Sequence, residues 1–252
     1  MATPQKTING AIVLDRHSLD KQLSRNPVDY PGGFVFLIDK PYGWTSSDAV
    51  RKLKFSLQRW FGVKNIKVGH AGTLDPLATG VLMVCAGKAT KIAEALQSQE
   101  KEYIAEITFG ATTPSFDLEK EIDATFPTSH ITKGAIDSVI PGFLGTQEQM
   151  PPLFSAKLID GRRAYEIARE GKEATMKPAL ITIHSMEVML WESPVLTLRI
   201  SCSKGTYVRS VARDLGISLG SGAHLSGLIR SSSGEFRVAD AISFEKLKPF
   251  FE

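Results

Sequence analysis

Asp75 is a single carboxylate in a basic stretch of the chain, and it could do chemistry on a nucleic acid. Positions 49 to 93 carry eight Lys and Arg residues, and Asp75 is the one acid among them. Nearby cations favour the charged form of a carboxylate, so Asp75 should stay ionised. Pro76 disfavours helical backbone for the residue before it, which predicts an extended or turning segment at Asp75. The alternative is a structural one, in which Asp75 caps a helix and Pro76 fills the first turn.

The segment around Asp75, residues 69–80 (GHAGTLDPLATG), closely resembles the catalytic loop of the bacterial tRNA pseudouridine synthase B family. Four other segments resemble motifs of that family, in the family's order: residues 39–47 (DKPYGWTSS), 101–103 (KEY), 202–210 (CSKGTYVRS) and 222–225 (GAHL). The matches span residues 34 to 236. This resemblance implies an RNA-modifying isomerase that converts the T-loop uridine, position 55 of tRNA, to pseudouridine.

Pseudouridine formation breaks the N1 glycosidic bond, turns the uracil and rejoins it to the ribose through C5. The reaction has no redox change and no group transfer, so no cofactor and no metal are implied. By resemblance Asp75 is the nucleophile, a role that a carboxylate can fill because it forms and releases covalent adducts. Attack on the ribose and elimination through a glycal both remain open. The uridine must also be flipped out of the loop, which costs roughly a few kcal/mol.

Four residues are expected around the uracil by resemblance. Tyr103 would stack on the flipped base and is the candidate to relay the proton lost from C5; by position alone it is a core tyrosine. Arg209 would pair with Asp75 and Tyr207 would line the uracil pocket, and an extended strand would place both side chains on one face. A phosphate contact is the alternative for Arg209. Leu228 matches an apolar pocket residue, although alone it reads as core.

The other candidates would contact RNA or support the loops. His70 resembles a histidine that helps to open the T-loop, and it could otherwise be an ordinary loop residue or a general base. Lys91, Lys40 and Lys204 are candidates for phosphate or loop-support contacts. Asp117 resembles an acid that orders an RNA-facing turn, and a simple Asp turn is equally compatible.

Mixed strand and helix patterns without a regular βαβ rhythm predict an α+β fold. The resemblance implies a mixed, largely antiparallel central sheet flanked by helices, the pseudouridine synthase fold. Residues 1–32 are expected to form a loosely attached N-terminal extension, and residues 33–252 a catalytic domain with a thumb-like insertion at about 150–171. A helix capped by Ser46 or Ser47 should carry a basic face that either is solvated or contacts RNA. Many family members continue into a C-terminal RNA-binding domain, for which this chain leaves no room, so recognition is expected to centre on the T-arm stem-loop.

Length and composition are typical of an intracellular protein with one large domain or two small ones. The chain has 252 residues, a formal charge of +3 and a pI near 8.8. Cys85 and Cys202 lie in apolar runs and have no metal-ligand spacing, so both should be buried and reduced. No signal peptide or membrane-spanning stretch is evident, which predicts a cytoplasmic protein. We expect a monomer that needs no protein partner.

The motifs depart from the family in places. Lys157 lies one position before the place where the family's thumb usually has a lysine. Ile229 replaces the first arginine of a pair that the family usually has at positions 229 and 230. A noncatalytic RNA-binding protein on the same scaffold is the rival hypothesis, and a synthase acting on ribosomal RNA or guided by a partner complex is a third. The intact acid favours the tRNA enzyme, because phosphate binding gains nothing from a carboxylate in the groove.

Overall fold

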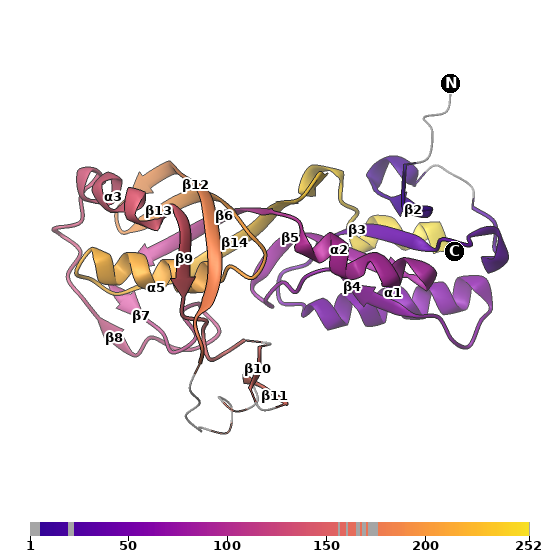
Figure 1. Ribbon diagram of the computed structural model, residues 1–252, viewed down its shortest axis with the longest axis horizontal. Coiled ribbons are helices and arrows are strands. Elements are labelled where there is room, and N and C mark those ends of the chain that lie inside the picture. The colour runs from indigo at the N-terminus through magenta and orange to yellow at the C-terminus, as the bar shows by residue number, and fades with distance from the viewer. Residues whose placement is uncertain are drawn as a thin grey trace. The chain divides into compact units, whose positions relative to one another are not determined.

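The computed structural model describes residues 6–19, 23–155, 157–159, 161–164, 167, 170 and 176–251. The chain divides into two compact units, drawn in Figure 1. The first unit comprises Met1–Lys101 together with Ile229–Glu252, and the second is Glu102–Leu228. Strand β6 (Lys101–Phe109) leads into the second unit, and strand β14 (Ala223–Ser233) carries the chain back. Among the described residues, both units contribute strands to one 11-stranded sheet.

The first unit is built on strands in the order β1-β2-β3-β5-β14. Strand β4 pairs with β5 and strand β15 with β14, and the pairing of β2 with β3 is parallel. Strands β3 and β5 form an unbroken antiparallel ladder that ends with Lys40 opposite Gly80. The bounds are β1 (Thr7–Ile8), β2 (Ala11–Leu14), β3 (Phe34–Lys40), β4 (Val68–His70), β5 (Ala78–Ala86) and β15 (Phe236–Arg237).

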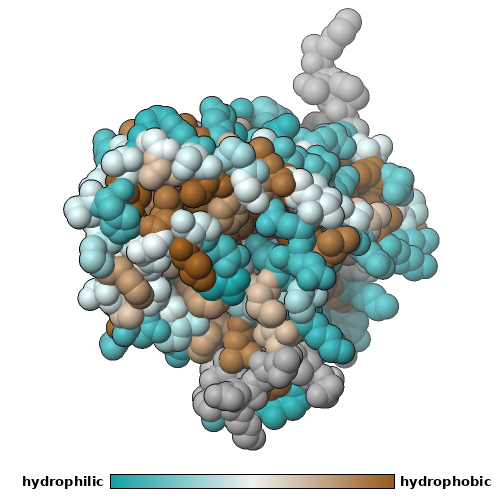
Figure 2. Space-filling model, turned by 60° about the vertical axis from the view of Figure 1, so that its left-hand side comes forward, coloured by the Kyte–Doolittle hydropathy of each residue, from teal (hydrophilic) through white to brown (hydrophobic). Residues whose placement is uncertain are grey.

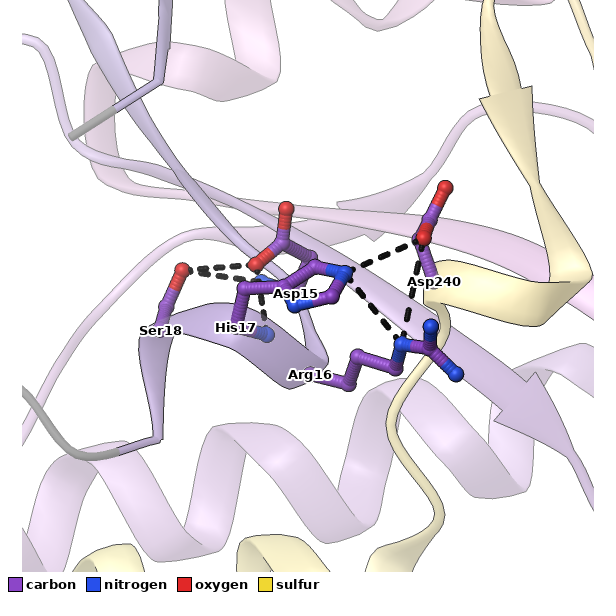
Figure 3. A network of polar contacts seen from close by, with 5 residues as sticks. All are labelled: Asp15, Arg16, His17, Ser18 and Asp240. Carbon is purple, nitrogen blue, oxygen red and sulfur yellow. Dashed lines mark hydrogen bonds and ion pairs between the residues drawn. The ribbon is translucent and has the colours of Figure 1, made fainter. Parts of the chain in front are cut away.

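The expectation that the N-terminal residues are loosely attached is wrong for residues 11–14. These residues form strand β2, and Val13 is fully buried in the core of the first unit. After β2, a short 3-10 helix, η1 (Arg16–Ser18), contacts η5 (Val238–Asp240). Figure 3 shows Asp240 facing Arg16 and His17. The His17 Nε2 atom lies 3.3 Å from the Asp240 carboxylate. The apolar segment at residues 11–14 is only four residues long and has polar neighbours, so the sequence did not predict a strand there.

Helix α1 (Ser46–Phe61) is amphipathic, as predicted, but its cap is Thr45 and not Ser46 or Ser47. Thr45 Oγ1 accepts from the Asp48 backbone N–H (3.0 Å), and the Asp48 carboxylate accepts from the Thr45 N–H (2.9 Å), which forms a capping box. Buried side chains of α1 recur at helical spacing, and the helix ends at the left-handed Gly62. We call the exposed side chains Lys52, Lys54 and Arg59 the basic face of α1.

The basic face excludes Arg51, because the Arg51 guanidinium is paired with Asp48.

The first unit also holds η2 (Pro27–Asp29), η3 (Gly87–Ile92), α2 (Ala93–Ser98), α6 (Phe244–Leu247) and η6 (Pro249–Phe251).

The second unit has strands in the order β14-β6-β13-β12-β9. The alternation of residues along positions 103–109 predicts a half-buried strand, and the burial of alternate residues of β6 confirms it. The other elements are β7 (Ala111–Thr112), β8 (Ala124–Thr125), α3 (Lys133–Val139), η4 (Ile140–Phe143), β9 (Gly145–Gln149), β10 (Leu158–Ile159), β11 (Arg162–Arg163), β12 (Ala179–Glu192), β13 (Val195–Cys202) and α5 (Val208–Ser218).

The predicted thumb at about 150–171 falls partly outside the described residues. Its described part includes the antiparallel pair β10–β11. The early lysine, Lys157, donates from Nζ to the backbone oxygen of Lys177 (2.7 Å), which follows the predicted insertion.

The predicted α+β class with a mixed, largely antiparallel sheet is confirmed, since β3–β5, β12–β13 and β12–β9 pair antiparallel and β2–β3 pairs parallel. Cys85 and Cys202 are buried free thiols, as expected. Apolar side chains also reach the surface among hydrophilic ones (Figure 2), which is normal for a protein surface and assigns no partner. None of the helices in the described part of the chain is long and apolar enough to cross a membrane.

Candidate active site

Asp75 lies, half-buried, in the turn between β4 and β5. Its backbone oxygen accepts a hydrogen bond from the Ala78 N–H (3.1 Å), and β5 begins at that alanine. The next residue, Pro76, is fixed in turn, because its carbonyl accepts from the Gly43 N–H (2.9 Å). The segment after Asp75 is therefore a turn into a strand. This confirms the predicted turning backbone and excludes the helix-cap alternative.

The first residue of α1 anchors the residue before Asp75. Ser46 Oγ accepts from the Leu74 backbone N–H (2.8 Å) and donates to the Leu74 carbonyl (3.0 Å). Ser46 is buried, so these bonds are shielded from water. A side chain predicted to cap the helix thus fixes the Asp75 turn instead.

Lys40, at the end of β3, supports the same turn from the other side. Its Nζ donates to the carbonyls of Pro41 (2.9 Å), Trp44 (2.6 Å) and Pro76 (3.2 Å), and the side chain is 1% exposed. Burial lowers the pKa of Lys40 to about 8, against the opposing effect of the Asp75 charge. Of its two predicted roles, phosphate contact or loop support, the geometry favours loop support.

Arg230 is the remaining member of the usual arginine pair, and it was not predicted to belong to the site. It lies on β14, is 1% exposed, and donates to the carbonyls of Val81 (2.8 Å), Gly72 (3.2 Å) and Thr73 (3.3 Å). These acceptors lie on both sides of Asp75 in the sequence. The glycine punctuation of residues 69–80 was the one sequence signal that another chain segment approaches closely here.

His70 occupies the end of β4, opposite Val84, so it is not an ordinary loop residue. Burial, followed by the charge of Arg230, lowers the pKa of His70, which keeps the imidazole neutral at physiological pH. Its Nδ1 is buried and has no hydrogen-bond partner in the described part of the chain. Lys91 is exposed on η3, where it is accessible to a phosphate group.

The second unit holds the candidates for the uracil pocket. Tyr103 is 8% exposed on β6, and Leu228 is half-buried on β14. Tyr207 is half-buried at the N-terminal cap position of α5. Its backbone is clamped by Gln149 of β9: the Tyr207 N–H donates to Gln149 Oε1 (2.8 Å), and Gln149 Nε2 donates to the Tyr207 carbonyl (3.1 Å). The edge strand therefore fixes the start of α5.

Arg209 lies in the first turn of α5, so the prediction of an extended strand through Tyr207 and Arg209 is wrong. The Arg209 side chain is 3% exposed, which disfavours the alternative of a phosphate contact. It forms a buried ion pair with Asp117 (Nε to Oδ2, 3.5 Å) and donates to the carbonyl of Ser115 (3.3 Å). No local sequence pattern indicates this pair, because its members lie 92 positions apart.

Asp117 forms the predicted Asp turn, since its carboxylate accepts from the Glu119 N–H (3.0 Å). The turn is also tied by Thr113 Oγ1, which donates to the Asp117 carbonyl (2.6 Å). Phe116 adopts a left-handed φ of 62°, which costs free energy for a residue with a side chain. The Arg213 guanidinium lies 5.0 Å from the centre of the Phe116 ring. Arg209 therefore forms its ion pair with a turn that is strained at Phe116 and held by several hydrogen bonds.

Two groups of candidates are assembled within the separate units. Asp75, Lys40 and Arg230 belong to the first unit, and Arg209 and Asp117 to the second. The predicted pairing of Arg209 with Asp75 joins residues of different units and stays a prediction. Among the described residues, no cluster of three or more His, Cys, Asp or Glu is placed to hold a metal ion.

Sequence comparison matches residues 58–208, more than half of the chain, to the family described as "TruB family pseudouridylate synthase (N terminal domain)". The chain belongs to the TruB family of pseudouridylate synthases. The matched region of this TruB family member includes Asp75, Tyr103 and Asp117.

Curated relatives resemble this TruB family member over most of their length. A "tRNA pseudouridine synthase B" of Phocaeicola vulgatus is 50% identical over 225 residues, 89% of this chain and 96% of the relative. A protein of the same name from Parabacteroides distasonis is 51% identical over 225 residues, with the same coverage of 89% and 96%.

Solved structures agree on the fold of the TruB family member. A chain of a Cbf5-Nop10-Gar1 complex matches with a TM-score of 0.64 and 29% identity, over 85% of this chain and 53% of that chain. A chain of an H/ACA ribonucleoprotein bound to a substrate RNA containing 2'-deoxyuridine matches with a TM-score of 0.62 and 26% identity, over 96% of this chain and 58% of that chain. This chain thus spans little more than half of each solved chain.

Proposed function

We propose that this TruB family member is a tRNA pseudouridine synthase that isomerises the T-loop uridine at position 55, with Asp75 as the nucleophile. The observation that carries the proposal is the clamped turn at Asp75. Ser46 fixes the residue before the acid, and Lys40 fixes the residue after it. A carboxylate held in this way can reach one fixed point on a flipped nucleotide, which is what positional catalysis requires.

The other residues divide the remaining tasks. Tyr103 stacks on the extruded uracil, Tyr207 and Leu228 line its pocket, and Arg209 is the catalytic cation. His70 and Lys91 contact the RNA. The family assignment and the relatives of about 50% identity support the tRNA substrate. Every group named here comes from this one chain, so we propose that the protein acts as a monomer. We also propose that it acts in the cytoplasm.

The decisive experiment is Asp75→Asn, which keeps the shape of the side chain and removes its charge and nucleophilicity. Single-turnover formation of pseudouridine on unmodified tRNA should fall by at least about a thousandfold, while the dissociation constant for tRNA should change by less than about threefold. Asp137→Asn, on exposed helix α3, is the matched control and should keep the normal rate. An Asp75→Asn variant with more than a tenth of the normal rate would contradict the nucleophile assignment.

The same assay separates the rival functions. A noncatalytic RNA-binding protein would bind tRNA and leave its uridines unchanged. A tRNA with cytidine at position 55 should yield no pseudouridine, and any modification elsewhere in it would refute the proposed target site.

The T-arm proposal is tested by comparing whole tRNA with an isolated T-arm stem-loop at one salt concentration. Shape and splayed-out loop bases should suffice for recognition, so catalytic efficiency on the two substrates should agree within about tenfold. A loss of about a hundredfold on the stem-loop, equivalent to about 2.7 kcal/mol of transition-state binding, would show contacts beyond the T-arm.

A further inference from the structure

We infer that Arg230 is a positioning residue for catalysis. Its buried guanidinium connects the chain segment that enters the Asp75 turn with the segment that leaves it. The inference rests on the proposed function, because it concerns the step in which Asp75 acts.

The hydrogen bonds of Arg230 carry the argument. Arg230 Nη2 and Nη1 donate to the carbonyls of Gly72 and Thr73, which precede Asp75, and Nε donates to the carbonyl of Val81, which follows it. A planar guanidinium presents five donors in a fixed fork, so one side chain can fix several carbonyls at set angles. Arg230 therefore determines the separation of the two flanks of the turn.

The glycines of the loop fit this arrangement. Gly80 has a φ of +100°, and a Cβ at that position would lie 2.3 Å from the Arg230 carbonyl oxygen and 2.7 Å from its nitrogen. Only a residue without a side chain lets β14 approach β5 this closely. Gly72, with a φ of +103°, also adopts a backbone that disfavours side chains, and its carbonyl is one of the Arg230 acceptors.

The charge of Arg230 acts on the same site. It is among the groups that lower the pKa of both Lys40 and His70, so its field reaches the lysine beneath the turn and the histidine before it. Asp75, Asp48 and Asp39 act on Lys40 with the opposite sign. Arg230 is thus placed to affect both the geometry and the charge balance around the nucleophile, although at 1% exposure it cannot itself reach RNA in this structure.

The test compares Arg230→Met, Arg230→Lys and Val13→Ala in the full-length protein. Methionine fills much of the arginine volume and removes the charge and all donors. Lysine keeps the charge but lacks the fork. Val13 is buried in β2, and β3 lies between β2 and β5 in the sheet. Val13→Ala should therefore lower stability without changing the contacts of the Asp75 turn.

The expected result is a separation of rate from binding. Arg230→Met should lower the single-turnover rate on saturating tRNA by about a hundredfold, as expected for a misplaced reacting group, with a dissociation constant within threefold of wild type. Arg230→Lys should have a single-turnover rate below a tenth of the wild-type rate, because lysine lacks the fixed fork of guanidinium donors. Hydrogen exchange of residues 71–81 should accelerate in both variants, and Val13→Ala should keep the normal rate.

Three outcomes would overturn the inference: a rate within threefold of wild type in Arg230→Met, an equal loss of rate in Val13→Ala, or full activity in Arg230→Lys. If Arg230→Met does not fold, the lysine variant and its exchange pattern decide the question alone. Wild-type protein provides the test of the function itself. If it forms no pseudouridine, the proposed function fails, whereas an active wild type with equally active Arg230 variants refutes the positioning role alone.

Discussion

Lys40 should make the stability of the protein depend on pH in a direction that a simple ion pair would not produce. A lysine in the unfolded chain keeps its proton up to a pH near the ordinary pKa of 10.5, whereas burial lowers the pKa of Lys40 in the folded protein to about 8. Between these values the unfolded chain binds more protons than the folded one. The free energy of unfolding must therefore rise with pH in this window.

The magnitude follows from the size of the pKa difference. Each pKa unit corresponds to about 1.4 kcal/mol, and most of the window lies between pH 7 and pH 10. Lys40 should therefore add about 2 to 3 kcal/mol to the free energy of unfolding over that interval. The contribution is absent below pH 7, where Lys40 is protonated in both states, and complete above about pH 10.5.

The assay is urea unfolding at half-unit intervals from pH 7 to pH 10, for wild type, Lys40→Met and Lys40→Arg. Other titrating groups are common to all three proteins, so the difference between wild type and Lys40→Met isolates this lysine. Lys40→Arg is the matched control, because a guanidinium keeps its charge throughout the range and should not show the rise. Parallel curves for wild type and Lys40→Met would refute the reasoning, since Lys40 would then titrate alike in both states.

Other predictions concern the substrate and the second unit. Tyr103→Phe should keep stacking and tRNA affinity but lower the single-turnover rate at least about tenfold; a near-normal rate would leave the ring as a stacking platform with no part in proton transfer. Replacing the basic face of α1 by alanines should reduce the slope of log affinity against log salt by about 2 to 3, and an unchanged slope would mean that this face is merely solvated. Asp117→Asn should destabilise the protein by about 3 kcal/mol in urea unfolding, because it removes the negative charge from a buried ion pair with Arg209; a change below 1 kcal/mol would show that the pair is unimportant.

The sequence predicts well those features that depend on neighbouring residues. The alternation along residues 103–109 predicted β6, and helical spacing predicted the buried face of α1. The Asp-Pro pair predicted a turn at Asp75 because proline restricts the residue before it. The weaker predictions fell where two local signals compete, as at residues 45–47, where three consecutive hydroxyl side chains could each have capped α1.

Features that depend on distant contacts could not be predicted in the same way. Ser46 and Leu74 are 28 positions apart, and Arg230 and Gly72 are 158 apart. No local pattern links such residues, and a lysine or arginine that will satisfy backbone carbonyls has the same side chain as one that will bind phosphate. Arg209 illustrates the difficulty: its partner Asp117 was recognised as a turn residue, but the ion pair between them emerged from the fold.

The basic character around Asp75 divides into two parts that the sequence could not separate. All eight Lys and Arg residues between positions 49 and 93 are exposed, so water and salt screen their effect on the carboxylate. One cation that does interact with Asp75 in the structure is Lys40, which lies outside that stretch and is buried, where screening is weak. Buried cations therefore shape the turn and its charge, while the exposed cations remain available to an RNA backbone. A variant of an exposed lysine should accordingly change affinity and salt dependence, whereas a variant of Lys40 or Arg230 should change the rate.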